Sequence, residues 1–456
     1  MQRLNTLLNR FAIVAVVLAC TLGPEGFGEN ADRSALTGSV IFIHPDGASA
    51  ATWTAARALY VGPDNNLNWD LLPAVGVYRG HMNDSLTATS NGGATTHAFG
   101  VKVASSAFGL TSGGERGERI VDEQGRSLSV AMQAMRVGIP VGLVQTGVST
   151  EPGTACFVTE AASRSQHFDI AAQLIESDAK VLFGGGEKHF LPKGTVGVHG
   201  EGTRPDGRNL VAEAIDRGYT VVRTRDELLS LPTSTEKVLG LFAWDATFHD
   251  KPEEILQAKG LQNFDPEAPT VAEMTDTAIR LLSAGGQNFL LVVEEEASDN
   301  MGNNNNASGT LEATRRADEA IGVALRHLAD HPQTLLITCA DSDGGGLRMN
   351  GIVLEPGEEA PRSLPAWDPN GSPVDGVNGT GSAPFIAAAD RNGRRLPFAV
   401  VWSSKTDVSG GILVRADGLN SQRVRGTVDN TMIAELIRLT LFGSPDGPAG
   451  PALSAR

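Results

Sequence analysis

Residues 288–309 read NFLLVVEEEASDNMGNNNNASG, and this stretch guides the interpretation of the whole chain. Its apolar run FLLVV (289–293) predicts a buried β-strand, and a dense group of carboxylate and amide side chains follows it directly. Because Asn, Gly, Asp and Ser are common in turns, one interpretation is a solvated loop. Carboxylate and amide oxygens are also the ligands that hard cations prefer, so the other interpretation is a metal site.

Strand-like apolar runs alternate with amphipathic helical patterns along the rest of the chain. The apolar runs are VIFI (40–43), VGLVQ (141–145), VLFGGG (181–186), VLGLFA (238–243), FLLVV (289–293), TLLIT (334–338) and FAVVW (398–402). The clearest helical patterns cover residues 127–136, 271–283 and 310–328. Strands that are apolar on both faces and separated by helices are typical of a parallel sheet covered on both sides. The sequence therefore predicts an α/β fold, a three-layer α/β/α sandwich around a largely parallel sheet, with residues 355–383 as a surface loop.

The first twenty residues predict an export signal. Arg3 and Arg10 provide positive charge, and FAIVAVVLAC (11–20) provides an apolar core that is too short to span a bilayer. The core ends at Cys20 in a pattern that resembles a bacterial lipoprotein cleavage site, with Leu18 larger than the usual residue. We therefore expect an exported protein that is periplasmic, extracellular or anchored to the envelope by a lipid on Cys20.

Composition restricts the classes of partner. Acidic residues outnumber basic ones by 53 to 37, which gives a formal net charge of −16. Nucleic-acid-binding surfaces are normally basic, so we expect no nucleic acid partner. Apart from Cys20, the chain has Cys156 and Cys339, both in apolar surroundings, and we expect free core cysteines.

Three aspartates stand directly after predicted strands. Asp46 follows VIFI, Asp299 follows FLLVV and Asp341 follows TLLIT. Each could be a helix cap. However, ligands of open α/β sheets bind beyond the carboxyl ends of the strands, where these three carboxylates could share a cation.

Seven stretches between about residues 39 and 443 belong together. They read VIFIHPDGASAATWTAARALY, DSLTATSNGGATTHAFGVK, VLFGGGEKHFLP, DGRNLVAEAIDRGYTVVRTRDELL, VLGLFA, PTVAEMTDTAIRLLS and FLLVVEEEASDN. In these stretches, in their order and in their spacing, the chain resembles the alkaline phosphatases. The resemblance implies an alkaline-phosphatase-like catalytic domain over residues 39–443, which would follow a linker (21–38) and precede a flexible tail (444–456).

The resemblance also implies a serine nucleophile. The family's serine lies twelve residues before the Lys of a GVK triplet, and counting back from Lys102 reaches Ser90, where the family's preceding Asp is Thr89. A helix that begins near Ala94 would direct its N–H groups at a phosphate. The alternative role of Ser90 is a helix N-cap.

Arg164 falls where the family has its phosphate-binding arginine, whose planar guanidinium donates two parallel hydrogen bonds to phosphate. Its alternative role is a solvated residue at a helix end. The family's third metal site implies Glu294 as one ligand. Counting back from Arg164 places Glu151 at the acidic position of the same site and Gly153 at its hydroxyl position. A shift of the alignment by one residue would instead supply Thr154 as the ligand.

The family's two-zinc centre uses three aspartates, which map to Asp46, Asp299 and Asp341, and three histidines. Two of the histidine positions are Asn303 and Ser342 here. The third should lie in TDVSGGILVRA (406–416), and no histidine follows His331. The matched positions therefore offer oxygen ligands, which favour Mg²⁺, Ca²⁺ or Mn²⁺, while the resemblance keeps Zn²⁺ open. We expect His44 and His97 to be packing or substrate-side residues, although either could lend a nitrogen.

These observations predict an exported, metal-dependent phosphomonoesterase that acts on small phosphate monoesters through a phosphoserine at Ser90. A phosphodiesterase or sulfatase of the same superfamily is the alternative enzyme. Because the histidines are missing, a catalytically inactive protein that binds phosphate or metal is the alternative from another class. The resemblance further implies a homodimer.

Overall fold

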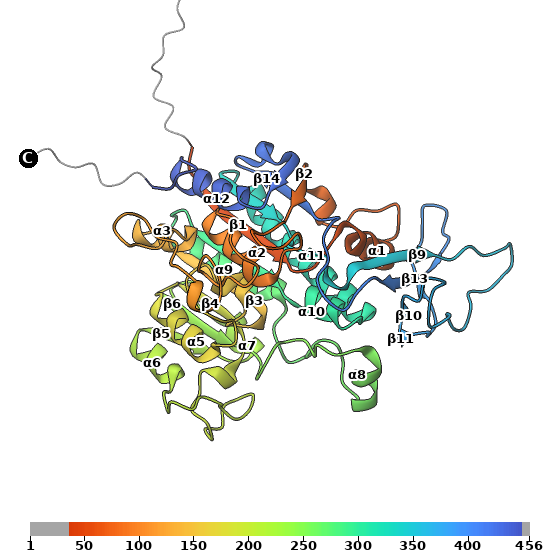
Figure 1. The fold of residues 1–456 in the computed structure, drawn as a ribbon, viewed down its shortest axis with the longest axis horizontal. Helices are drawn as coiled ribbons and strands as arrows, with labels where there is room; N and C mark the ends of the chain where they lie inside the picture. The colour runs from red at the N-terminus through yellow and green to blue at the C-terminus, as the bar shows by residue number, and fades with distance from the viewer. Residues whose placement is uncertain (1–35, 449–456) are drawn as a thin grey trace, which may run out of the picture. The chain divides into compact units, whose positions relative to one another are not determined.

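A computed structural model describes residues 36–448 and contains one large sheet of ten strands (Figure 1). The strands lie in the order β15-β2-β14-β8-β1-β7-β3-β4-β6-β5. Their bounds are β1 (Ser39–Pro45), β2 (Ala74–Arg79), β3 (Val141–Val148), β4 (Val181–Gly185), β5 (Tyr219–Val222), β6 (Lys237–Leu241), β7 (Leu290–Glu295), β8 (Thr334–Thr338), β14 (Leu413–Gly418) and β15 (Arg425–Asp429).

Nearly all pairs of neighbouring strands in this sheet are parallel. Only β14 runs antiparallel to its neighbours, β2 and β8. Six of the predicted apolar runs form β1, β3, β4, β6, β7 and β8, so the prediction of a largely parallel sheet is confirmed. The remaining strands of the sheet, β2, β5, β14 and β15, were not among the predicted runs.

Helices cover both faces of the sheet, as the side chains of β1 show. Val40 and Phe42 lie in one apolar core, while Ile41 and Ile43 lie in the other. The first core includes side chains from α2 (Ser90–Phe99), α3 (Val130–Arg136), α4 (Pro152–Ala155), α5 (His167–Glu176), α6 (Leu210–Asp216) and α12 (Met432–Phe442). The second includes side chains from α1 (Ala50–Tyr60), α7 (Arg225–Leu229), α9 (Val271–Ser283) and α11 (Ala307–Asp330). The predicted three-layer α/β/α sandwich is therefore confirmed.

A second, smaller sheet corrects one prediction. It consists of β9 (Leu347–Gly351), β10 (Val374–Gly376), β11 (Gly379–Thr380), β12 (Phe385–Ile386) and β13 (Pro397–Trp402), and all its pairs are antiparallel. The run FAVVW, predicted with the strands of the parallel sheet, is β13 of this small sheet. Its side chains are apolar because Phe398, Val400 and Trp402 pack in the second core. Periodicity thus identified a buried strand but not its partners. The predicted loop 355–383 contains β10 and β11.

Several predictions concern segments outside the described residues. These are the export signal (1–20) with Cys20, residues 21–35 of the linker and residues 449–456 of the tail. Within residues 36–448, none of the helices combines the length and apolar character needed to cross a membrane. Cys156 and Cys339 are buried and free, as expected.

Candidate active site

Four neighbouring strands of the main sheet end at one edge, and their ends carry the predicted site residues. β8, β1, β7 and β3 lie side by side and run parallel. Asp341 follows β8, Asp46 follows β1, and Asp299 lies on the short helix α10 (Ala297–Asn303) that follows β7. All three side chains are buried. The topology therefore brings together the three aspartates that the sequence placed after separate strands.

The three consecutive glutamates have different surroundings. Glu294 and Glu296 form a buried cluster with Asp46, in which one carboxylate oxygen of each residue lies within 4.8 Å of the others. Burial, together with neighbouring carboxylates, raises the pKa values of Glu294 and Glu296 well above the usual range. Glu295 instead accepts a hydrogen bond of 2.6 Å from the Thr146 hydroxyl. Burial raises the pKa of Glu295 to about 8.

Asp46 also belongs to a second buried cluster, with His44 and Asp341. His44 Nε2 lies 3.4 Å from Asp46 Oδ1. Burial acts to raise the pKa of Asp46, but His44 in its protonated form, together with the Asp341 and Ser90 side chains, lowers it to about 2. Burial and the charge of Asp46 raise the pKa of Asp341, while the hydroxyl of Ser342 acts to lower it. Ser342 therefore lies beside the cluster, and its role as a metal ligand stays a prediction.

Asn303 makes hydrogen bonds from both atoms of its amide group. Its Oδ1 accepts a hydrogen bond of 2.8 Å from the Gly345 N–H. Its Nδ2 consequently points into the site and donates at 2.8 Å to both Asp299 and Asp407. An amide nitrogen that donates hydrogen bonds has no lone pair for a cation, so in this orientation Asn303 connects two carboxylates, and its role as a metal ligand stays a prediction.

Ser90 is the first residue of helix α2 and is buried. The helix begins at Ser90 and not near Ala94 as predicted, because the Thr89 side chain caps it by accepting a hydrogen bond of 3.3 Å from the Gly92 N–H. The cap is therefore Thr89, which leaves the Ser90 hydroxyl free of that role. The same turn contacts the carboxylates, since a Cβ added to Gly93 would lie 2.4 Å from Asp341 Oδ2.

Arg164 lies in the turn before α5 and forms an ion pair with Glu151. Its guanidinium remains 43% exposed, and the negative charges of Glu151, Glu296 and Asp46 raise its pKa. Glu151 was predicted as a ligand of the third metal site, but its carboxylate faces Arg164. The alternative ligand, Thr154, accepts a hydrogen bond of 2.7 Å from Gln145.

Gly153 lies between these two candidates and directly against Glu294. A Cβ added to Gly153 would lie 1.5 Å from Glu294 Oε1, so the position accommodates no side chain. The backbone of α4 therefore closes this side of the Asp46–Glu294–Glu296 cluster.

Many carboxylate oxygens of the two acidic clusters are buried without a hydrogen-bond partner, which bears on whether a cation fits there. Within residues 36–448, both carboxylate oxygens of Asp46, Glu294 and Asp341 lack a partner, as do Asp299 Oδ1 and Glu296 Oε2. Each uncompensated buried charge costs about several kcal/mol, so these carboxyls either take up protons, as their raised pKa values allow, or are ionised next to positive charge. Carboxylate ligands in such number suit hard divalent cations. The residues present therefore fit divalent metal ions.

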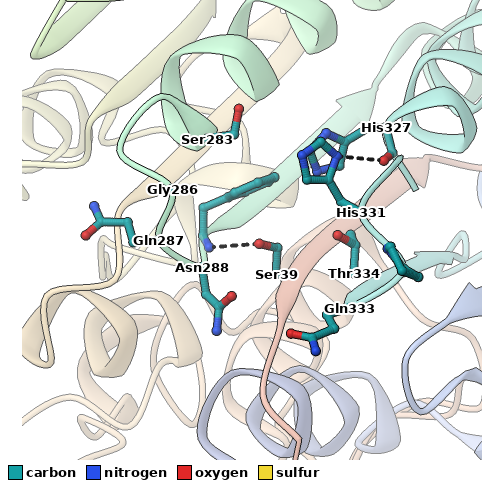
Figure 2. Close-up of a pocket in the computed structure, with 11 residues that line it drawn as sticks. Ser39, Ser283, Gly286, Gln287, Asn288, His327, His331, Gln333 and Thr334 are labelled. Carbon is teal, nitrogen blue, oxygen red and sulfur yellow. Dashed lines mark hydrogen bonds between the residues drawn. The ribbon is translucent and has the colours of Figure 1, made fainter. Parts of the chain in front are cut away.

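A separate cavity of about 390 Å³ lies at the opposite ends of the central strands (Figure 2). Its walls include Ser39 at the start of β1 and Thr334 at the start of β8. The rings of His327 and His331 stack beside them, with centroids 4.1 Å apart. None of the predicted site residues lines this cavity. The acidic clusters are at the other edge of the sheet.

The model of the alkaline phosphatase family matches residues 38–442, which is nearly the whole described chain. The chain belongs to the alkaline phosphatase family. It is 30% identical over 336 residues to the membrane-bound alkaline phosphatase of Bombyx mori, a match that covers 66% of this chain and 59% of that protein. The alkaline phosphatase of Gadus morhua is 27% identical over 336 residues, with 66% and 68% covered. The match to the Bombyx mori protein thus spans less than two thirds of its length.

Solved alkaline phosphatases share the fold. The Thermus thermophilus enzyme superposes with a TM-score of 0.68 at 22% identity, covering 92% of this chain and 95% of that one. The enzyme of the Antarctic bacterium TAB5 superposes with a TM-score of 0.65 at 22% identity, covering 89% and 98%.

Two carboxylates of this alkaline phosphatase family member escaped the sequence interpretation. Asp407 lies in the segment where the family's third histidine was expected, and Asn303 connects it to Asp299. The position of Asp407 in TDVSGGILVRA was the sequence signal that could have identified it as a site residue. Glu296 was visible as the third glutamate of EEE, but a single sequence does not show which of these side chains face the same cluster.

Proposed function

We propose that this chain hydrolyses phosphate monoesters through a phosphoserine at Ser90, with divalent cations held by buried carboxylates. The observation that carries this proposal is the place of Ser90, as the first residue of α2, next to Asp46. The first turn of the same helix contacts Asp341. The N–H groups of a helix N-terminus favour a phosphate at that position.

The reaction would take place in two displacements. Ser90 Oγ would form a bond to phosphorus while the ester P–O bond breaks and the alcohol leaves. Water would then hydrolyse the phosphoserine, releasing phosphate and restoring the Ser90 hydroxyl. Bound divalent cations supply electrostatic stabilisation of the charge that develops on the entering and leaving oxygens.

Arg164 would hold the phosphoryl group during both displacements. Its exposed guanidinium can donate two parallel hydrogen bonds to phosphate oxygens. The ion pair with Glu151 fixes one side of the guanidinium and restricts the directions in which the other donors point. Glu151 therefore positions Arg164 in this proposal.

Asp46, Glu294, Asp299 and Asp341 would hold the cations, with Glu296 and Asp407 adding negative charge. Such a carboxylate-rich site favours Mg²⁺, Ca²⁺ or Mn²⁺ over Zn²⁺, which draws mainly on histidine and cysteine. We further propose export, on the basis of residues 1–20, and leave open whether the mature protein is anchored through Cys20. A homodimer is proposed from the family resemblance alone.

The test compares Ser90→Ala with Ser85→Ala, a serine in the loop that precedes α2 and outside the clusters. Hydrolysis of p-nitrophenyl phosphate would be measured after chelation and after addition of Mg²⁺, Ca²⁺, Mn²⁺ or Zn²⁺. We expect Ser90→Ala to lower kcat by roughly 1,000-fold or more, because the covalent route is lost. Ser85→Ala should retain wild-type activity. Acid quench with labelled substrate should trap phosphate on the peptide that contains Ser90.

Other substrates separate this proposal from its alternatives. A higher kcat/KM on bis-p-nitrophenyl phosphate than on the monoester would identify a phosphodiesterase, and preferred hydrolysis of p-nitrophenyl sulfate would identify a sulfatase. Phosphate binding without turnover under any of the four cations would identify an inactive binding protein. Each of these three results would replace the proposal.

A further inference from the structure

His44 lies on β1, two residues before Asp46, and its side chain is only 1% exposed. Its Nδ1 lies 2.7 Å from the backbone carbonyl oxygen of Cys339, on the segment that follows β8. A carbonyl oxygen only accepts hydrogen bonds, so Nδ1 carries the proton. In the neutral imidazole, Nε2 therefore carries the lone pair that can bind a metal.

The lone pair of Nε2 faces the carboxylates. Nε2 lies 3.4 Å from Asp46 Oδ1 and 4.0 Å from Glu294 Oε1, and it has no hydrogen-bond partner within residues 36–448. A charge-assisted N–H···O bond would be about 2.7–2.9 Å long, so 3.4 Å is too long for a direct pair. Two ligand atoms that each lie about 2.1 Å from one ion, at an angle of 90–109°, are about 3.0–3.4 Å apart. The observed separation matches a shared ion.

We propose that His44 Nε2 is a ligand of the cation held by Asp46 and Asp341. The ligand atoms of these three residues lie within 4.8 Å of one another, and all three side chains are buried. The family resemblance places a histidine directly after Asp341, where this chain has Ser342. His44 supplies a nitrogen from the neighbouring strand, a position that the family's six-residue zinc pattern does not include.

A nitrogen ligand changes which ion this position prefers. Imidazole binds Mn²⁺ and later transition metals better than Mg²⁺ or Ca²⁺, which prefer oxygen. Among Mg²⁺, Ca²⁺ and Mn²⁺, His44 therefore favours Mn²⁺ at the Asp46–Asp341 position. This inference requires a bound cation but does not depend on the phosphoserine step.

His97 provides a matched control. It is equally buried, and its ring centroid lies 5.5 Å from that of His44. However, its Nε2 is 2.7 Å from the Tyr78 hydroxyl and does not face a carboxylate. Any effect of buried imidazole on the cation that is not direct ligation should be common to both histidines.

The experiment loads the full protein with Mn²⁺ and measures pulsed electron paramagnetic resonance. We expect nitrogen coupling in the wild type, a change to the ¹⁵N pattern when histidine is ¹⁵N-labelled, loss in His44→Gln and retention in His97→Gln. Wild-type Mn²⁺ without nitrogen coupling would overturn the inference, as would coupling that survives in His44→Gln or disappears in His97→Gln. If His44→Gln does not fold, the nitrogen coupling of the ¹⁵N-labelled wild type and of His97→Gln still shows whether a histidine other than His97 binds the Mn²⁺.

Calorimetry gives an independent readout. Mn²⁺ affinity should fall at least about tenfold in His44→Gln, and Mg²⁺ affinity should fall less. Equal losses for the two ions would contradict a nitrogen ligand. Failure of the wild type to bind Mn²⁺ at all would instead contradict the metal dependence in the proposed function, and with it this inference.

Discussion

At the scale of single residues, the four consecutive asparagines 303–306 perform different tasks. Asn303 donates to two carboxylates of the site. Asn305 adopts a left-handed backbone conformation with φ of 54°, which Asn tolerates better than most residues. Asn306 caps α11 by accepting a hydrogen bond of 2.6 Å from the Gly309 N–H. The first residue of the run thus contacts carboxylates of the site, while the later ones shape a turn that is not a solvated loop, because Asn305 and Asn306 are buried.

Asn303 and Ser342, at two expected histidine positions, and Asp407, in the segment where the third was expected, should determine zinc affinity. We predict that Asn303→His, Ser342→His and Asp407→His together raise zinc affinity by at least about tenfold, because imidazole is a better zinc ligand than the groups it replaces. Competition with a chromophoric chelator would measure the affinity.

The double variant Asn303→His, Ser342→His serves as control and should gain less zinc affinity than the triple variant. Equal zinc affinity in the double and triple variants would show that Asp407 is not part of the metal centre. Loss of zinc affinity in the triple variant would contradict the predicted role of all three positions.

At the scale of secondary structure elements, the short helix α4 is positioned by contact with a carboxylate. We predict that Gly153→Ala weakens cation binding by at least about tenfold, because its Cβ would displace Glu294 or the helix. Overpacking should also lower the free energy of unfolding by about 1–3 kcal/mol. Calorimetric titration with Mn²⁺ and denaturant unfolding would measure the two effects.

Gly351→Ala is the matched control for this substitution. A Cβ at Gly351 has open space around it, and we expect a change in stability of no more than about 0.5 kcal/mol with unchanged Mn²⁺ affinity. If Gly153→Ala behaved in the same way, the contact between Gly153 and Glu294 would not restrict the site.

The sequence predicted the central elements better than the outer ones. VIFI, FLLVV and TLLIT are apolar on both faces because β1, β7 and β8 lie between two layers of helices. The strand β2 reads AVGVYR and is half-exposed, so its pattern is much weaker. The sequence also did not show which strands pair, because hydrophobic periodicity does not encode strand partners. The assignment of FAVVW to the wrong sheet is an example.

Within the site, the sequence predicted the residues that depend on backbone position and missed those that depend on side-chain orientation. Asp46, Asp299 and Asp341 follow strands, so parallel topology alone brings them together. The orientation of Asn303 depends on the distant N–H of Gly345, and the free Nε2 of His44 depends on the carbonyl of Cys339. Neither contact leaves a signal in a single sequence.

At the scale of the whole molecule, the acidic clusters connect metal binding to stability. The chain has a net charge of −16, and within residues 36–448 partnerless buried oxygens of Asp46, Glu294 and Asp341 belong to clusters at one sheet edge. Without cations, these carboxylates repel one another, which raises the pKa values of Asp299 and Asp341 in addition to the effect of burial. Folding should therefore be linked to cation binding.

We predict that chelation lowers the Tm. Each cation present at 100 times its Kd stabilises the fold by about 2.7 kcal/mol, which corresponds to about 3 °C for about 400 ordered residues. Differential scanning calorimetry with chelator, and then with Mn²⁺ or Mg²⁺ restored, would measure this. Potassium chloride at equal ionic strength is the control and should not restore the Tm. An unchanged Tm after verified metal removal would contradict the link.

Asp46 belongs to both clusters, and this affects how metal occupancy depends on the concentration of metal ions. A cation at the Asp46–Asp341 position and one at the Asp46–Glu294–Glu296 position draw on the same carboxylate, so neither binds independently. Thermodynamic reciprocity then requires that each ion change the affinity of the other by the same factor. If both positions hold a cation, as the proposed function requires, depletion of one metal would therefore alter retention of the other, with Asp46 as the point of coupling.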